Sequence, residues 1–224
     1  NGRIKAHIKV DTGMNRIGVK DKKEIPGLLD LLATMPMVRL KGAFTHFACA
    51  DSPDQGMTGA QLARFFEMMA LLPKGLLLHA GASSAALLRP DTRFSMVRVG
   101  IALYGYPPVK TKVNLRPVLS WETEIIHVKE ICPGDSVSYG ATMTANRPRK
   151  VATLAVGYGD GYKRLLSNKV DVLINGKRCP VLGTICMDQT MADITDAGPV
   201  EIGSRAVLIG KDGEEEITAD ELAH

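Results

Sequence analysis

The chain has 224 residues, of which 45% are hydrophobic and 23% charged, and its net charge is +4. This length fits one large domain or two ordinary ones, with enough apolar residues for a buried core. The apolar runs are shorter than the about 18 residues that a membrane span needs, and the N-terminus lacks a signal-peptide pattern. The basic residues are dispersed, which argues against nucleic-acid binding. A protein without a membrane segment, acting on a small anionic ligand, fits better.

The four cysteines, Cys49, Cys132, Cys179 and Cys186, show neither CxxC spacing nor the density of a disulfide framework. Such usage is typical of reduced thiols in a cytoplasmic protein. No zinc or other metal site is expected from this pattern.

In the first half of the chain, strand-like runs alternate with helical patterns. The runs predict strands over 4–11, 38–48, 75–81 and 95–105, and helices over 22–35, 58–72 and 83–88. Alternation of this kind is typical of a parallel sheet or a (β/α) barrel, although four such units cannot close an eight-stranded barrel.

After about residue 112 the helical signal disappears and strands separated by turns follow. The predicted strands lie within 120–131, 136–145, 150–162, 170–195 and 205–218. Asn175-Gly176 and Asp212-Gly213 predict hairpins, and residues 218–221 form a capping box that predicts a final helix. The sequence therefore predicts two domains, 1–112 with α/β character and 113–224 with mainly β character, the second incomplete at its end.

Arg98 stands inside a predicted strand that is otherwise apolar. A buried guanidinium requires acceptors, because an unpaired charge in a core is unfavourable by several kcal/mol. One interpretation is a structural ion pair. The alternative is a ligand contact, because Arg98 lies just before Gly100 and Ile101, where a parallel strand would end and ligands bind.

The preceding unit offers a second anion-binding feature. The segment "HAGASSAALL" runs from a strand end into a helix, with Ser83 or Ser84 as the expected cap. A helix N-terminus with hydroxyl groups is a natural phosphate site, although a serine there also serves as an ordinary cap. Two consecutive strand ends with anion-binding groups indicate one phosphate.

Other polar residues also fall near predicted strand ends. His46 lies at the end of the second strand, and Lys9 alternates with His7 and Asp11 on the first. Arg16 lies in the glycine-containing loop that follows. Each of these has an ordinary structural or solvated interpretation, which also serves for His79.

In the second half, Tyr139 and Tyr158 each lie among small residues. The glycines of "GYGDG" lack the strand-to-helix setting of a nucleotide fingerprint, so a dinucleotide or P-loop site is rejected. The segment "GTICMDQT" places Cys186, Met187 and Asp188 in a row at a predicted strand end.

These motifs occur in a characteristic order: "HIKVDTGMNRIG", "THFA", "HAGASSAALLRP", "MVRVGIALYG", "VSYGATMTA", "GYGDGY" and "GTICMDQT". The ordered set closely resembles alanine racemases, the fold-type III pyridoxal-phosphate enzymes. The resemblance implies the C-terminal part of a (β/α)8 TIM-type barrel that holds pyridoxal 5'-phosphate, followed by a β-rich domain. It also implies a head-to-tail homodimer with composite active sites.

The resemblance assigns roles at the cofactor. Arg98 would donate to the pyridine nitrogen, which weakens the electron sink and favours proton exchange over transamination. Ser84, the backbone of Gly100 and Ile101, and Tyr158 would hold the phosphate.

It also assigns roles around the substrate. Tyr139 would be one of two bases and His46 would link it to Arg98. The residues expected around the substrate carboxylate and the cofactor's phenolic oxygen are Arg16, Met187 and Asp188, with Lys9 as a possible carbamylated lysine.

The chain departs from the family pattern in three places. Ser83 stands where asparagine is usual, the closing tyrosine is missing, and no segment resembles the "KANAYGHG" motif that carries the cofactor-binding lysine. The 224 residues by themselves are therefore expected to be inactive.

Several functions remain open at this point. The leading one is racemisation of L- and D-alanine, which supplies D-alanine for the bacterial cell wall. One alternative is a serine or broad-specificity racemase, including the catalytic domain of a membrane-anchored protein, because the same fold and motifs could serve these substrates. A non-catalytic pyridoxal-phosphate module fits less well, because barrel-only carriers of this cofactor lack a β domain with Tyr139 and the "CMDQT" stretch. A fold-type III decarboxylase also fits less well, because it is not expected to keep Tyr139, His46 and Arg98 together.

Overall fold

The computed structural model describes residues 4–223. The chain forms two compact units that divide between Val118 and Leu119. The outermost residues of the two predicted domains, 1–3 and 224, lie outside the described range. Each unit is described by itself below.

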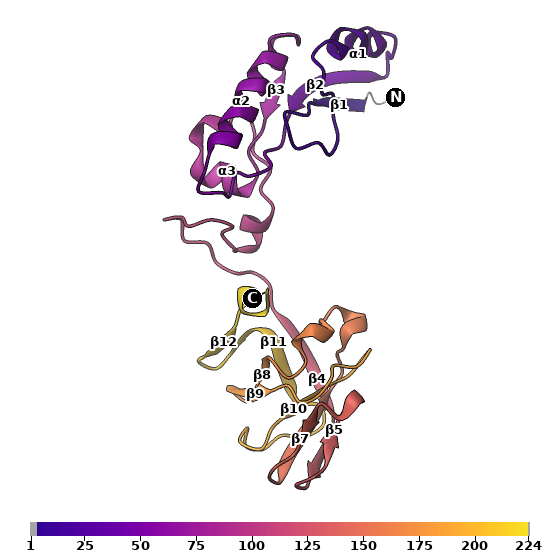
Figure 1. Cartoon of the computed structure of the whole chain (residues 1–224), viewed down its shortest axis with the longest axis vertical. Coiled ribbons are helices and arrows are strands. Elements are labelled where there is room, and N and C mark those ends of the chain that lie inside the picture. Colours follow the sequence, from indigo (N-terminus) through magenta and orange to yellow (C-terminus); the bar gives the residue numbers. More distant parts are fainter. Residues whose placement is uncertain (1–3, 224) are drawn as a thin grey trace. The chain divides into compact units, whose positions relative to one another are not determined.

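Unit 1 contains a three-stranded parallel sheet in the order β1-β2-β3 (Figure 1). Its strands are β1 (Ile4–Lys9), β2 (Val38–Phe44) and β3 (Leu77–His79). The predicted parallel sheet is confirmed, and the described strands form an open sheet of three rather than a closed barrel. The pairing of β1 with β2 shifts register between Ala6 and His7. Because of this shift, His7 lies opposite Gly42.

Three helices connect and follow these strands: α1 (Glu24–Ala33), α2 (Gly56–Met69) and α3 (Ser83–Leu88). In α2 the buried residues are Thr58, Gln61, Leu62, Phe65 and Met68, a spacing that places them on one helical face. The apolar residues of this face pack in one hydrophobic core with Ile8 and Ala43 of the sheet and with Val10, which follows β1.

The predicted strand over 95–105 is wrong. Arg98 forms only an isolated bridge with Ala82, and Ile101–Tyr104 is a 3₁₀ helix. A parallel ladder needs a partner of matching length, and β3 has only three residues. The apolar pattern of this segment is therefore largely exposed, with Leu103 at 71%.

Unit 2 is built on a seven-stranded sheet in the order β10-β7-β4-β11-β8-β9, with β12 paired to β11. Its strands are β4 (Trp121–Ile131), β7 (Arg149–Leu154), β8 (Asp171–Ile174), β9 (Lys177–Pro180), β10 (Thr190–Asp193), β11 (Arg205–Asp212) and β12 (Glu215–Ile217). A small pair, β5 (Ser136–Val137) and β6 (Met143–Thr144), stands beside it. All pairings in this unit that join named strands are antiparallel.

Both predicted hairpins are confirmed. Asn175 and Gly176 join β8 to β9 with φ values of 53° and 70°, the left-handed conformation that an Asn-Gly turn supplies. Gly213 follows β11 and leads into β12. The predicted final helix is present as α4 (Ala219–Ala223), and the Glu221 amide donates to Thr218 Oγ1.

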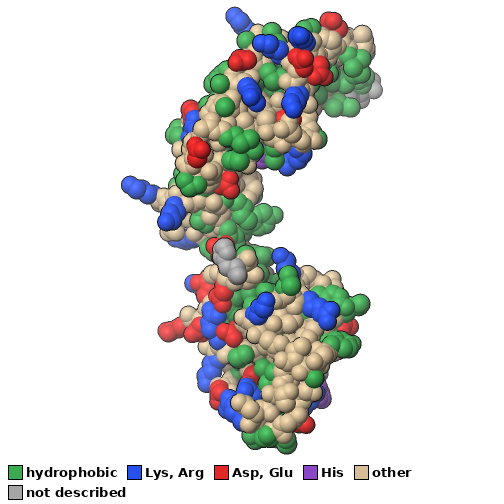
Figure 2. All heavy atoms as spheres, viewed as in Figure 1, with side chains coloured by type: hydrophobic (Ala, Val, Ile, Leu, Met, Phe, Trp, Pro, Cys, Tyr) green, Lys and Arg blue, Asp and Glu red, His purple; other side chains and the backbone are tan. Residues whose placement is uncertain are grey.

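Charged side chains of both signs are interspersed over the visible face of each unit (Figure 2), in keeping with the dispersed charges of the sequence. Among residues 4–223, no helix is long and apolar enough to cross a membrane.

Candidate active site

The carboxyl ends of the three parallel strands bring the aromatic and histidine side chains of unit 1 together. The Phe44 and His79 rings stack with centroids 4.7 Å apart, and the His7 and His79 centroids lie 5.0 Å apart. His7 fits here because Gly42 lacks a side chain: an added Cβ would lie 2.6 Å from the His7 ring. The register shift at His7 and the glycine together make this histidine cluster possible.

Arg98 is the centre of this cluster. Its Nη1 donates to His79 Nδ1 at 2.7 Å, and its Nη2 lies 2.8 Å from the Thr45 carbonyl and 3.1 Å from His46 Nδ1. A further contact reaches the Ala80 carbonyl. The guanidinium also lies over the Phe44 ring, with Cζ 5.2 Å from the centroid.

The contacts of Arg98 differ from those of a structural ion pair. No carboxylate within residues 4–223 lies within 4 Å of its guanidinium, and all its acceptors are carbonyl or imidazole atoms. Among residues 4–223, the Nε–H of Arg98 has no hydrogen-bond acceptor. One donor of a permanently cationic group is thus available for a ligand.

The hydrogen bonds fix the tautomer of His79. Arginine has only donors, so His79 Nδ1 must accept and a neutral His79 carries its proton on Nε2. That nitrogen lies 2.7 Å from His7 Nδ1 and donates to it. His7, His79 and Arg98 thus form one directed chain of hydrogen bonds.

Burial and positive charge both lower the pKa values of His79 and His46. Burial, together with Arg98 and His7, lowers the pKa of His79 to about 4, and burial has the largest effect. Burial also lowers the pKa of His46, and Arg98, Arg16 and Lys9 act in the same direction. A neutral His46 accepts from Arg98 on Nδ1 and carries a proton on Nε2, which leaves that N–H for another partner.

Lys9 lies at the same edge, with Nζ 3.0 Å from the Val10 carbonyl and 5.4 Å from the Phe44 centroid. Burial lowers its pKa; Asp11 opposes this effect, and Arg98 and Arg16 add to it. Asp11 instead holds the following loop, because its carboxylate accepts from the Gly13 and Asn15 amides. Arg16, in this loop, is exposed.

The two serines of α3 occupy different positions from those expected. The helix N-cap is Ala82, so neither Ser83 nor Ser84 caps it by a side-chain bond, which corrects the prediction. The Ser83 hydroxyl instead accepts from the Gly100 amide at 3.0 Å and from the Ala102 amide at 3.3 Å. Ser83 thereby ties the loop at Gly100 to the helix.

Ser84 faces a different environment from Ser83. It lines a cavity of about 210 Å³ together with His46 and Met14. Gly100 and Ile101 lie at the surface, with open space around Gly100 apart from the Ser83 hydroxyl. These are the unit 1 residues that the sequence proposed for the phosphate.

In unit 2 three separate segments meet. The Tyr158 amide donates to the Cys186 carbonyl at 2.9 Å, and the Gly159 amide donates to the Met187 carbonyl at 2.7 Å. An added Cβ at Gly157 would lie 2.3 Å from the Cys186 carbonyl, so only glycine allows this approach. The third segment, residues 137–142, contacts the second through Thr184, whose hydroxyl donates to the Tyr139 carbonyl at 2.8 Å.

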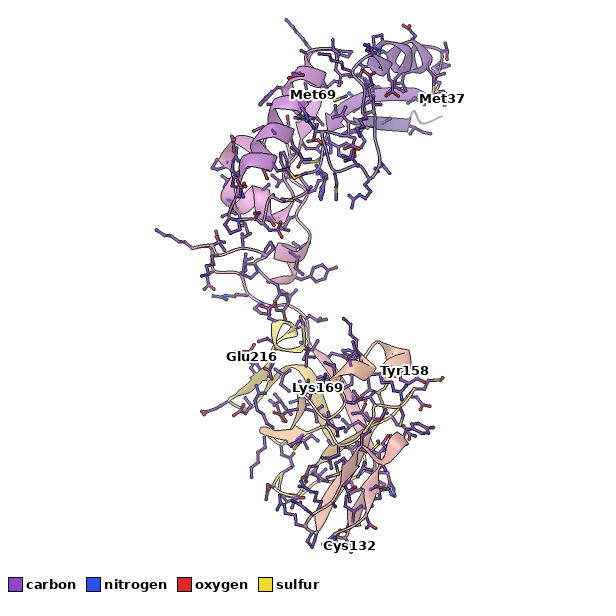
Figure 3. All side chains as sticks on the ribbon, viewed as in Figure 1. Met37, Met69, Cys132, Tyr158, Lys169 and Glu216 are labelled. Atoms are coloured by element: carbon purple, nitrogen blue, oxygen red, sulfur yellow. The ribbon has the colours of Figure 1, made fainter. Side chains whose placement is uncertain are left out.

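The candidate residues of unit 2 present their side chains to solvent. Tyr139 is 69% exposed, Tyr158 44% and Met187 61%, and Asp188 is also exposed. Tyr158, labelled in Figure 3, begins the 3₁₀ helix Tyr158–Asp160 that follows β7. Such exposed aromatic and sulfur-containing side chains, on a backbone tied by hydrogen bonds, are typical of a binding surface.

Sequence reasoning missed His79 as part of the site. Its place near the end of a predicted parallel strand, over 75–81, was the available signal, but only the fold brings it to Arg98. Within residues 4–223 no group of three or more histidine, cysteine or acidic side chains is placed to hold a metal ion.

Two features define the class of protein: an α/β unit with an arginine surrounded by neutral histidines, and a β unit with two tyrosine loops. Comparison with known proteins identifies this class. Residues 1–108 match the family model "Alanine racemase, N-terminal domain", and residues 118–224 match "Alanine racemase, C-terminal domain". The chain belongs to the alanine racemase family, which confirms the resemblance seen in its motifs.

Individual relatives agree with this family. The chain is 46% identical to an alanine racemase of Symbiobacterium thermophilum over 98% of its length, and 40% identical to that of Geobacillus stearothermophilus over 98%. It covers 60% and 58% of these proteins. The chain thus spans about three fifths of the length of the curated relatives it matches.

Solved structures give the same result. The crystal structure of alanine racemase from Bacillus anthracis with bound L-Ala-P has a TM-score of 0.90 and 37% identity, covering 100% of this chain and 59% of that chain. Histidine racemase from Leuconostoc mesenteroides has the same TM-score at 29% identity, covering 99% and 60%.

Proposed function

We propose that the protein containing this chain is an isomerase that interconverts L- and D-alanine with pyridoxal 5'-phosphate, and that it supplies D-alanine for the bacterial cell wall. The observation that carries the proposal is Arg98, a guanidinium surrounded by neutral acceptors with its Nε–H available. The relatives named alanine racemase, at 40–46% identity, support the choice of reaction and substrate.

The residues present fit the cofactor. Bound pyridoxal phosphate supplies an electron sink for the substrate Cα. Arg98 has a donor available for the ring nitrogen and does not give up its proton, so it leaves that nitrogen unprotonated. For the phosphate, we assign the backbone of Gly100 and Ile101, the Ser84 hydroxyl and Tyr158. The open space around Gly100 supports the close approach of an anion, which would share the Gly100 amide with the Ser83 hydroxyl.

Tyr139 is the proposed base on one face of the substrate. A phenol has an ordinary pKa of about 10, so it needs a partner that stabilises its deprotonated form. His46 is suited to this task because Arg98 occupies its Nδ1 and leaves an Nε2 proton to donate. The second base is the lysine of the family motif that these 224 residues lack.

At the substrate carboxylate we place Arg16, Met187 and Asp188. Arg16 supplies an exposed positive charge, and Met187 a backbone N–H. Lys9 is a candidate for carbamylation, because carbon dioxide reacts with a neutral amine and burial lowers the pKa of this lysine. The carbamate would orient Arg16.

For the whole protein we propose a head-to-tail homodimer whose active sites combine both subunits, in the cytoplasm. The exposed Tyr139 and Met187 side chains support a composite site, and the four free cysteines suit a reducing compartment. We also propose that the open sheet of unit 1 is part of a (β/α)8 barrel. Because the chain is also similar in structure to a histidine racemase, other amino acids should be tested as substrates. The higher sequence identity to alanine racemases favours alanine as the substrate.

The test is Cα hydrogen exchange by the complete protein. With L-alanine in deuterated water, we expect D-alanine to form with deuterium at Cα. Tyr139→Phe is expected to lower kcat by about 100-fold or more, because a positioned acid–base group contributes this much. Absence of exchange with alanine, serine and histidine would contradict the racemase assignment, and full activity of Tyr139→Phe would contradict the role of the phenol.

A further inference from the structure

We propose that Asn168, Gly183 and Thr184 form a polar clamp that positions Tyr139 for proton transfer. The clamp acts on the tyrosine loop, defined as residues 137–142. The inference rests on the proposed function, in which Tyr139 is a base. The clamp residues are positioning residues, since they contact the loop rather than the substrate.

The tyrosine loop has a backbone that would relax without support. Ser138 has φ 65° and ψ −174°, Gly140 has φ 74° and Ala141 has φ 46°. Left-handed φ values are unfavourable for serine and alanine, and persist only where the surroundings determine them. Ser138, directly before Tyr139, and Ala141, two residues after it, therefore require outside contacts.

Thr184 provides two of these contacts. The Ser138 hydroxyl donates to the Thr184 carbonyl, and the Thr184 hydroxyl donates to the Tyr139 carbonyl at 2.8 Å. These two bonds run in opposite directions between the same pair of segments. Thr184 is 8% exposed, so water has little access to compete for them.

Asn168 holds the loop from its other end. Its Nδ2 donates to Thr142 Oγ1 at 3.0 Å, and its Oδ1 accepts from the Gly183 amide at 2.5 Å. A single side-chain amide thus connects the tyrosine loop to the segment that carries Thr184. Asn168 directly precedes Lys169, which Figure 3 labels.

Gly183 lets the segments approach. Its φ is +73°, and an added Cβ would lie 2.4 Å from the Val137 carbonyl and 2.9 Å from Ser138 Cβ. Any side chain here would push the tyrosine loop away from Thr184.

The clamp matters because Tyr139 is 69% exposed. Packing within unit 2 does little to fix its phenol, so the direction of the side chain depends on the backbone that carries it. Proton transfer is sensitive to small misplacements of the base, so a loop fixed in advance favours reaction.

The experiment uses the complete protein and three threonine variants. Thr184→Val removes the hydroxyl group with little change of shape, whereas Thr184→Ser keeps a hydroxyl group at this position. Thr123→Val is the matched control. Thr123 also donates from its hydroxyl to a distant carbonyl, that of Ala155 at 3.0 Å. We expect Thr184→Val to lower kcat by about tenfold to a hundredfold with little change in KM. Thr184→Ser and Thr123→Val should stay close to wild type.

Two further readouts separate positioning from general loss of structure. The primary deuterium isotope effect should rise for the direction in which Tyr139 removes the proton and stay unchanged for the other. In protein with 3-fluorotyrosine at position 139, the fluorine NMR signal should broaden or split in Thr184→Val and stay single in Thr184→Ser. If Thr184→Val does not fold, Asn168→Gly serves, because glycine accepts the φ of 58° at this position and lacks both the donor to Thr142 and the acceptor for Gly183.

The outcomes are distinct for the clamp and for the function. A wild-type protein without Cα exchange overturns the proposed function, and the fluorine signal still tests the clamp. Wild-type kcat and one sharp fluorine signal in Thr184→Val, or an equal loss in Thr123→Val, overturn the clamp.

Discussion

At the scale of single residues, the arrangement around Arg98 depends on which histidine nitrogens carry protons. Arg98 donates to both His46 and His79, so each must present an unprotonated nitrogen. The sequence pointed to Arg98 and His46 from their positions near strand ends. It could not identify His79 in this role, because its contact with Arg98 forms only when the segment after α3 folds back beside β3 and the residues that follow it.

His79 makes the stability of unit 1 dependent on pH. Its pKa falls from 6.5 to about 4 on folding, so the unfolded chain binds more protons between these values. The stabilisation from its neutral form is present above pH 6.5 and is lost as the pH falls toward 4. At about 1.4 kcal/mol per pKa unit, the fall from 6.5 to about 4 corresponds to a loss on the order of 3 kcal/mol.

Urea denaturation followed by far-ultraviolet circular dichroism checks this dependence, since the single tryptophan, Trp121, belongs to unit 2. His79→Asn keeps an acceptor for Arg98 and does not titrate, so its unfolding free energy should fall less steeply in the same window. An identical slope in the variant would show that other groups cause the dependence.

At the scale of elements, local signals predicted most strands and helices because each signal acts within a few residues. The Asn175-Gly176 turn specifies left-handed φ values directly, and the hairpin follows. The segment 95–105 failed because an apolar run needs a partner strand, which lies outside the run itself. Glycines such as Gly183 are predicted only in part. The sequence shows where the glycine is, and only the fold shows which atoms approach it.

Substitutions at two glycines of unit 2 distinguish the effect of backbone strain on stability from the effect of a close contact. Gly176 and Gly183 have φ values of +70° and +73°, but an added Cβ would meet its nearest atom at 3.6 Å and 2.4 Å respectively. We expect Gly176→Ala to lower the free energy of unfolding by about 1 kcal/mol from φ strain alone. Gly183→Ala should lower it by about 2 kcal/mol more, because the clash adds to the strain.

Denaturation followed by Trp121 fluorescence measures both glycine variants, and the kcat of the complete protein provides a second comparison. Gly183→Ala should also reduce kcat, whereas Gly176→Ala should not. Equal effects of the two substitutions on stability would contradict the close contact at Gly183.

At the scale of the whole molecule, the proposed site divides between two compact units. Arg98, His46 and the phosphate-binding residues belong to unit 1, and Tyr139, Tyr158 and Met187 belong to unit 2. If the active site combines subunits, residues of the two units from different copies of the chain must act together.

A mixing experiment tests this composition. Tyr139→Phe and Arg98→Lys should each be nearly inactive, since lysine lacks the additional N–H groups through which Arg98 contacts its several acceptors. When the two complete proteins are unfolded and refolded together, mixed dimers should contain one site with both native residues. Random pairing predicts recovery of about a quarter of the wild-type activity. No recovery, with mixed dimers detected by mass spectrometry, would show that Tyr139 acts within its own subunit.

The sequence by itself determined the family, the parallel and antiparallel halves, the turns and most of the proposed site residues, because these depend on local patterns and on motif order. Only the tertiary structure decided that Arg98 contacts His79, that Ser83 holds the Gly100 loop and that Asn168 and Thr184 hold the tyrosine loop. These contacts join residues from 17 to 45 positions apart. Their geometry follows from strand register and close approach at glycine, which no local pattern specifies.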